Sequence, residues 1–257
     1  MSEPLKVFIT GASSGIGRAL AAEYARRGAI LGLVARRADA LADFRQSHPD
    51  CSISIYPADV RDAAALAHAA QQFVAAHGQP DVVIANAGVS RGVVTGEGDL
   101  GAFRDVMDTN YFGMVATFEP FAAAMRDARR GTLVGIASVA GVRGLPGSGA
   151  YSASKAAALA YLESLRVEMR PAGVKVVTIA PGYIRTPMTA RNPYPMPFLM
   201  DVERFAAKSA DAIAQGRAFA VFPWPMRIAA ALLRVLPRWL YDRAFENAPR
   251  KPRAAGQ

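Results

Sequence analysis

Two residues four positions apart, Tyr151 and Lys155, carry the clearest chemical signal in this sequence. On a helix that spacing places both side chains on one face, one turn apart. A lysine ammonium held beside a phenol favours the phenolate, so it would lower the tyrosine pKa from its ordinary value near ~10. Ser138 lies upstream as a further hydroxyl. The pair therefore predicts acid–base chemistry near neutral pH.

The segments that would position these side chains alternate between apolar strands and helices. Apolar runs at 5–9, 29–34, 53–56, 81–85, 132–137 and 174–179 predict strands. Helical stretches at 17–27, 39–46, 61–76, 99–129 and 151–170 lie between them, the fourth with a break expected near Gly113. This alternation is typical of a parallel sheet covered by helices on both faces, so we predict one α/β domain over residues 1–257.

Composition and cysteine content narrow the class of protein. The chain has 257 residues, of which 52% are hydrophobic, enough for one sizeable core. Its single cysteine, Cys51, excludes an intrachain disulfide. The three histidines have no carboxylate cluster at ligand spacing, so no metal site is expected. Because a secretory leader and an apolar run of ~18 residues are lacking, the sequence favours a cytoplasmic location.

The net charge of +9 prompts comparison with nucleic-acid binders. The 30 lysines and arginines are scattered and form no clustered stripe with readout residues, so no nucleic-acid partner is expected. The exception is the segment 226–257, which holds seven basic and two acidic residues. This segment is either a solvated basic surface or one with affinity for anionic ligands or lipid headgroups.

A glycine-rich turn follows the first predicted strand and precedes the first predicted helix. Peptide N–H groups at a helix start bind phosphate, and the helix dipole favours the negative charge. Glycines permit the tight turn and the close approach of a pyrophosphate. The turn therefore predicts a dinucleotide site formed by Gly11, Ser13, Ser14, Gly15, Ile16 and Gly17.

The end of the second predicted strand indicates which dinucleotide is bound. NAD sites usually place a carboxylate there for the ribose hydroxyls, whereas this chain has Arg36 and Arg37. A guanidinium can bind the 2′-phosphate of NADP with two charge-assisted hydrogen bonds, and the Ser14 hydroxyl could add another. We therefore predict NADP (NADPH) as the cofactor, with Arg36 as the principal contact.

Taken together, these residues resemble the short-chain dehydrogenase/reductase (SDR) family in its single-domain form. The family's motifs appear in its order across residues 5–190: Thr10 to Gly17, Asp59-Val60, Asn86-Ala87-Gly88, Asn110, Ser138, Tyr151 with Lys155, and Pro181 to Thr186. The resemblance implies a single-domain Rossmann fold, a doubly wound parallel sheet of about seven strands with helices on both faces. One departure is Ala85, where the family often has an asparagine that makes a supporting hydrogen bond.

The resemblance also implies roles within the cofactor site. Asp59 would bond the adenine amino group, and Val60 would lie along the ring. The segment Asn86-Ala87-Gly88 would flank the adenosine ribose and support the central strand. The nicotinamide end of the site would be formed by Pro181, Gly182, Ile184 and Thr186.

For catalysis, the resemblance implies an oxidoreductase that interconverts a carbonyl and a secondary alcohol by hydride transfer. Tyr151 would be the general acid/base, and Lys155 would bond the nicotinamide ribose and lower the Tyr151 pKa. Ser138 would orient the substrate oxygen. Asn110 would sit at a helix irregularity and hold a water that links Lys155 to solvent. The alternative of another class, a non-catalytic NADP-binding regulatory protein, would be expected to lack Tyr151 or Lys155.

The substrate side has less specific patterns. We expect a substrate lid over 187–225, within which 192–200 combines three prolines with aromatic residues and methionines. An apolar lid suits a bulky or apolar ketone, such as a lipid, acyl or polyketide-like compound. Arg91, Arg143 and Arg191 could instead bind an anion, which leaves open a sugar or nucleotide-sugar substrate of polysaccharide biosynthesis.

The C-terminal segment 226–257 is predicted to form a basic helix and tail. Its apolar residues, with arginines on one side and a tryptophan, fit a helix packed over the pocket or on a partner subunit, or one in peripheral contact with a membrane. Family members usually pair through the helices predicted here at 100–128 and 151–170. The resemblance therefore implies a homo-oligomer, either a dimer or a tetramer.

Overall fold

The computed structural model describes residues 3–251 and residue 253. Residues 1–2, 252 and 254–257, which belong to the predicted domain and basic tail, lie outside the described part. Within that part, no helix is long and apolar enough to cross a membrane.

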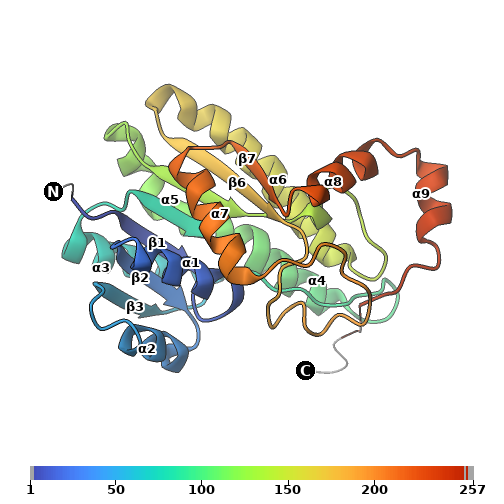
Figure 1. The fold of residues 1–257 in the computed structure, drawn as a ribbon, viewed down its shortest axis with the longest axis horizontal. Helices are drawn as coiled ribbons and strands as arrows, with labels where there is room; N and C mark the ends of the chain where they lie inside the picture. Colours follow the sequence, from blue (N-terminus) through green and yellow to red (C-terminus); the bar gives the residue numbers. More distant parts are fainter. Residues whose placement is uncertain (1–2, 252, 254–257) are drawn as a thin grey trace.

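Seven parallel strands form one sheet in the order β3-β2-β1-β4-β5-β6-β7 (Figure 1). The chain starts in the middle of the sheet, moves outward to β3, and then returns beside β1 to build the other half. This topology confirms the predicted doubly wound sheet of about seven strands. The strands are β1 Lys6–Thr10, β2 Ile30–Ala35, β3 Ile53–Pro57, β4 Val82–Ala85, β5 Thr132–Ile136, β6 Lys175–Pro181 and β7 Phe219–Phe222.

Helices cover both faces of the sheet because alternate strand residues point to opposite sides. On β1, Val7 and Ile9 belong to one hydrophobic core and Phe8 belongs to the other. The first core is closed by α1 (Gly15–Arg26), α2 (Ala38–Gln46) and α7 (Val202–Ala214). The second is closed by α3 (Ala63–His77), α5 (Gly113–Asp127) and α6 (Gly149–Met169).

The expected break in the long helix 99–129 is a π-helical turn, Asp108–Phe112. This turn joins α4 (Leu100–Met107) to α5. Gly113 begins α5 at a point where a Cβ atom would lie 2.7 Å from Cγ2 of Val60. The helix irregularity therefore coincides with a close approach between α5 and the loop after β3, which only glycine permits.

The end of the chain corrects two predicted ranges. The lid range 187–225 is too long, because residues 202–222 form α7 and β7 of the main body. Phe205 of α7 is fully buried, so this helix cannot move as a lid without opening the core. The single C-terminal helix is two helices, α8 (Pro225–Val235) and α9 (Arg238–Phe245), since Pro237 ends the run.

Candidate active site

A cleft of about 480 Å³ opens at the carboxyl ends of the central strands. Ligands of doubly wound sheets bind at this edge, where the strand order reverses between β1 and β4. Most of the predicted site residues line this cleft: Gly11, Ser13, Ser14, Gly15, Ile16, Arg36, Arg37, Asp59, Val60, Asn86, Ala87, Gly88, Ser138, Tyr151, Lys155, Pro181, Gly182, Ile184 and Thr186. Gly17 and Asn110 do not line it and act from behind its wall.

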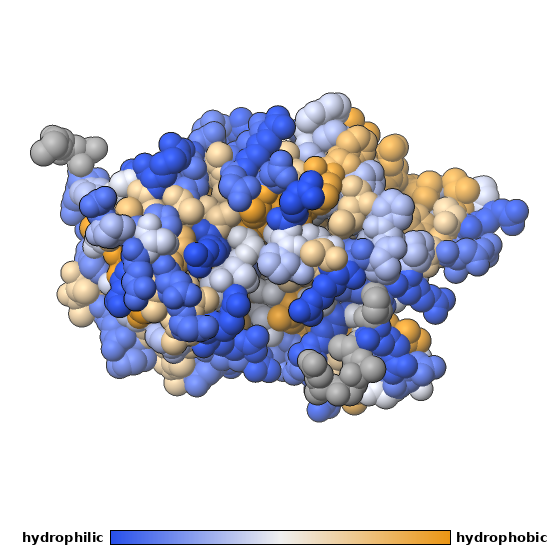
Figure 2. Space-filling view, turned by 60° about the horizontal axis from the view of Figure 1, so that its bottom comes forward, coloured by the Kyte–Doolittle hydropathy of each residue, from blue (hydrophilic) through white to orange (hydrophobic). Residues whose placement is uncertain are grey.

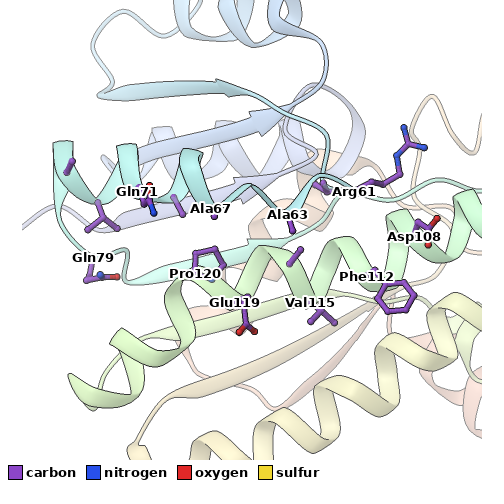
Figure 3. Close-up of a pocket in the computed structure, with 15 residues that line it drawn as sticks. Arg61, Ala63, Ala67, Gln71, Gln79, Asp108, Phe112, Val115, Glu119 and Pro120 are labelled. Carbon is purple, nitrogen blue, oxygen red and sulfur yellow. The ribbon is translucent and has the colours of Figure 1, made fainter. Parts of the chain in front are cut away.

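A larger hollow, of about 850 Å³, lies between α3 and α5 (Figure 3). Its walls carry Gln71 and Ala67 from α3 and Val115 and Glu119 from α5. None of the predicted catalytic side chains lines it. We therefore assign the chemistry to the smaller cleft, where the titratable groups converge.

The glycine-rich turn is built for close approach of an anion. Gly11 has a φ of +70°, and a Cβ there would lie 2.7 Å from Cα of Ala87. The Asn86 amide donates to the carbonyls of Thr10 (3.0 Å) and Gly11 (3.2 Å), which ties the turn to the loop after β4. A side chain at Gly17 would collide with the same amide. The turn therefore keeps its shape only with glycine at these positions.

The start of α1 fits a phosphate. Ser14 precedes the helix in an extended conformation, and its side chain makes no capping hydrogen bond. The first N–H groups of α1 are thus left without a side-chain acceptor, at the end of the helix where the dipole favours negative charge. These residues fit the pyrophosphate of a dinucleotide.

Two guanidinium groups, those of Arg36 and Arg37, line the cleft directly after β2. Arg37 donates to the carbonyl (2.9 Å) and the hydroxyl (3.2 Å) of Ser13. Arg36 lies 3.8 Å from a carboxylate oxygen of Asp59, and Arg61 binds the same carboxylate at 2.7 Å. The hydrogen bond from Arg61 is the main reason that the Asp59 pKa is lowered. The Asp59 carboxylate is thus held ionised, and β2 ends in cations.

Lys155 lines the cleft and is only 3% exposed. Its Nζ donates to the carbonyl of Ile136 at the end of β5 (2.8 Å) and lies 5.9 Å from the centre of the Tyr151 ring. Burial lowers the pKa of Lys155 to about 8, because an ammonium loses hydration there. Gly88 lies next to this ammonium group, since a Cβ atom added at Gly88 would be 3.6 Å from Nζ of Lys155.

Tyr151 lines the cleft together with Ser138. Burial raises the pKa of its phenol, while a hydrogen bond with Ser138 acts in the opposite direction. The predicted lowering of the Tyr151 pKa by Lys155 concerns the coenzyme-bound enzyme and stays a prediction. Ser138 ends the extended chain after β5, and its Oγ accepts from the N–H of Ala140 (3.1 Å). The hydroxyl is thereby fixed at the strand end beside the phenol.

Asn110 is fully buried and lies in the π-helical turn. Its amide donates to the Val89 carbonyl (2.9 Å) and to Oγ of Ser154 (2.9 Å), and its oxygen accepts from the Val89 N–H (2.7 Å). Sequence reasoning missed both partners. Asn110 thus joins the loop after β4 to α6, one residue from Lys155, and so positions two walls of the cleft.

Thr189 is another residue that sequence reasoning missed. It lines the cleft, its hydroxyl donates to the Ile184 carbonyl (2.6 Å), and it accepts from the N–H of Thr186 (3.0 Å). The spacing of Thr186 and Thr189 could have indicated this, since threonine hydroxyls often close such turns. The turn holds Ile184 and Thr186 against the cleft.

Two of the three loop arginines have protein partners. Arg91 pairs with Asp105 at 3.2 Å. Arg143 donates to the carbonyls of Leu233 (2.9 Å) and Leu236 (2.6 Å) at the end of α8. These contacts use only Nη1 of each guanidinium, which has five N–H donors, so the expected role of Arg91 and Arg143 as anion ligands stays a prediction. Arg191 is exposed.

Comparisons with known proteins agree with this geometry. The short chain dehydrogenase family profile matches residues 6–195. An uncharacterised oxidoreductase of Myxococcus xanthus (strain DK1622) is 39% identical, with 92% of this chain and 94% of the relative covered. A short-chain dehydrogenase/reductase from Burkholderia phymatum, solved in complex with NAD, has a similar fold (TM-score 0.83, 24% identity, covering 97% of this chain and 98% of that one). So does an alcohol dehydrogenase from Thermococcus sibiricus complexed with 5-hydroxy-NADP (TM-score 0.77, 23% identity, covering 86% and 96%).

The cleft unites a glycine-rich turn at a helix start with a serine, a tyrosine and a lysine at the carboxyl edge of the sheet. The family profile spans this whole arrangement. The chain therefore belongs to the short-chain dehydrogenase family and is an oxidoreductase of that family.

Proposed function

We propose that the protein interconverts a carbonyl and a secondary alcohol with NADP(H), using Tyr151 as the general acid/base. The observation that carries this proposal is the convergence of Ser138, Tyr151 and Lys155 in one cleft with the phosphate-binding turn. The bound nicotinamide would supply or accept the hydride.

The chain's own residues account for the proton and for orientation. Ser138 donates a hydrogen bond to the substrate oxygen, and Tyr151 protonates that oxygen during reduction. Burial raises the pKa of the Tyr151 phenol in the coenzyme-free protein, so the phenol carries the proton to be donated. Proton transfer near neutral pH would be favoured by the Lys155 ammonium and the bound nicotinamide, which would lower that pKa. Lys155 uses one of its three donors on the Ile136 carbonyl, which leaves two for a ribose hydroxyl and a water. Asn110 holds the loop after β4 against α6. We propose that it also binds the water that links Lys155 to solvent.

The preference for NADP is supported by charge at the adenosine end. Arg36 is exposed beside the cleft, Arg37 lies on Ser13, and no carboxylate ends β2. Two arginines favour the 2′-phosphate dianion of NADP. The free ribose hydroxyl of NAD would be bound better by a carboxylate. Among the similar structures, one binds NAD and another an NADP derivative, so the choice depends on these local residues.

A bulky, apolar carbonyl substrate is supported by the shortened lid, residues 187–201. Met188 lines the cleft. Burial is the main cause that raises the pKa of Tyr194. Tyr151 lies close enough to Tyr194 to add to this rise. The lid therefore brings aromatic and thioether groups to the reacting end.

A spectrophotometric screen tests this proposal. NADPH and NADH oxidation are followed with apolar ketones, acyl ketones and sugar ketones, and the Tyr151→Phe protein serves as the blank. We expect turnover with NADPH and an apolar ketone, and a loss of roughly 10²-fold or more in Tyr151→Phe with NADPH binding retained. Turnover by Tyr151→Phe at the normal rate would refute the assignment.

We also propose a cytoplasmic homo-oligomer. The free thiol of Cys51 is compatible with a reducing compartment. Phe112, which ends the π-helical turn before α5, and Val167 on α6 are exposed, and the hollow of Figure 3 adjoins α5. These features support pairing through α5 and α6. Light scattering during gel filtration should give a dimer or tetramer mass, and Val167→Glu should reduce it.

A further inference from the structure

The last two helices carry an apolar surface that is open to solvent. On α8, the exposed apolar residues recur every three or four positions, so they lie on one face of the helix. Two more project from α9. We call these residues the α8–α9 surface: Trp224, Ile228, Leu232, Val235, Trp239 and Leu240. Figure 1 shows both helices at one end of the molecule, and Figure 2 shows hydrophobic residues gathered around that end.

This apolar row is not what attaches α8 to the body. The helix packs through another face, where Met226 fills the space beside Gly182 and Ala230 is buried. A Cβ at Gly182 would lie 2.5 Å from Cγ of Met226. A surface helix usually turns polar residues to water on its outer face. The outward row of α8 is apolar instead, which marks a binding surface.

Unpaired cations flank the row. Arg227, Arg234, Arg238 and Arg243 are all exposed. In the described part of the chain, none of the four forms an ion pair. Tryptophan next to arginine is typical of groups that lie at the headgroup level of a bilayer. The charge therefore selects an anionic partner, and the apolar row selects one with an apolar interior.

We propose that the α8–α9 surface binds the face of an anionic phospholipid bilayer, with the apolar row in the headgroup region and the arginines on lipid phosphates. A second copy of the chain fits less well. A symmetric dimer through this surface would bring the arginines of both copies together, and like charges repel.

The surface is joined firmly to the active-site side of the domain. Arg143 binds the carboxyl end of α8 and lies over the Tyr241 ring of α9, 4.2 Å from its centre. The Tyr241 hydroxyl donates to the carbonyl of Gly144. Both contacts belong to the loop that begins with Ser138. Binding to a bilayer would therefore hold that loop near the lipid.

The chain offers an internal probe, because its two tryptophans, Trp224 and Trp239, both belong to this surface and are each 70% exposed. The full-length protein is titrated with vesicles of phosphatidylcholine alone or mixed with phosphatidylglycerol. We expect a blue shift of tryptophan emission, and quenching by brominated lipid, only with the anionic vesicles. The shift should reverse at high salt, since the arginine contribution is screened.

Matched variants separate the contribution of the apolar residues to vesicle binding from that of the arginines. Leu232→Ser should weaken binding about tenfold, from the loss of one buried leucine. Leu100→Ser is its control, because Leu100 is equally exposed (64% against 62%) but lies on α4. The double change Arg234→Glu and Arg238→Glu should weaken binding by at least about 25-fold, at roughly fivefold for each arginine. Arg126→Glu with Arg130→Glu, at the end of α5, is the charge control and should bind normally.

Three outcomes would overturn the proposal. These are an unshifted emission with anionic vesicles, equal binding to both vesicle types, and a blue shift that grows with protein concentration without lipid, which would indicate self-association. Vesicle binding is measured without coenzyme or ketone. Its failure would therefore leave the reductase assignment untouched.

Discussion

The burial of Lys155 leads to a prediction about stability that can be worked out in numbers. The folded-state pKa of about 8 lies below the ordinary value of 10.5. Between these values the unfolded chain binds more protons than the folded chain, so the free energy of unfolding rises with pH in this window. The charged lysine costs the folded state about 3 kcal/mol below pH 8, and this cost disappears as pH rises towards 10.5.

Lys155→Met removes this dependence while keeping a side chain of similar length. We expect wild type to gain about 2 kcal/mol of unfolding free energy relative to Lys155→Met between pH ~7 and pH ~9.5. Urea denaturation of the coenzyme-free proteins, followed by circular dichroism at both pH values, measures the difference. Lys208→Met, on the exposed side of α7, is the control for exchanging a lysine for a methionine.

The comparison isolates Lys155, because other titrating groups are shared by both proteins and cancel. If the difference between wild type and Lys155→Met were the same at both pH values, burial would not disfavour the ammonium. The reasoning about the Lys155 environment would then be refuted. Activity is a separate readout, and Lys155→Met should lose it at every pH.

Three further predictions concern the walls of the site. Arg36→Asp should weaken NADP binding much more than NAD binding in fluorescence titrations, since a carboxylate repels the 2′-phosphate; equal losses would remove Arg36 from this role. Gly17→Ala should lower the free energy of unfolding by about 1–3 kcal/mol and impair coenzyme binding, because the added methyl group meets the Gly11 carbonyl and the Asn86 amide. Arg143→Met should increase hydrogen exchange in α8 and α9, with β1 unaffected, since it leaves the carbonyls of Leu233 and Leu236 without their donor; unchanged exchange would show that Arg143 does not hold these helices.

Features that depend on neighbouring residues were predictable from the chain. The glycine turn, the spacing of Tyr151 and Lys155 and the alternation of strands with helices are short-range or periodic patterns. They reflect backbone sterics and the burial of one helix face, which act over a few residues. For this reason the parallel sheet, the cleft at its carboxyl edge and the helix break before Gly113 could be predicted from the sequence.

Features that depend on contacts between residues far apart in the sequence could not be predicted from the sequence. The partners of Asn110 and Arg143 lie far along the chain, and nothing near those positions marks them. Residues 202–222 look like an extension of a loop region until α7 and β7 are seen to close the sheet. The pKa of Tyr151 depends on how much water its neighbours exclude, a property of the packed domain and not of the four-residue spacing. The sequence therefore determines the local motifs of the site. The hydration of its groups and their long-range hydrogen-bond partners are determined only by the packing of the folded domain.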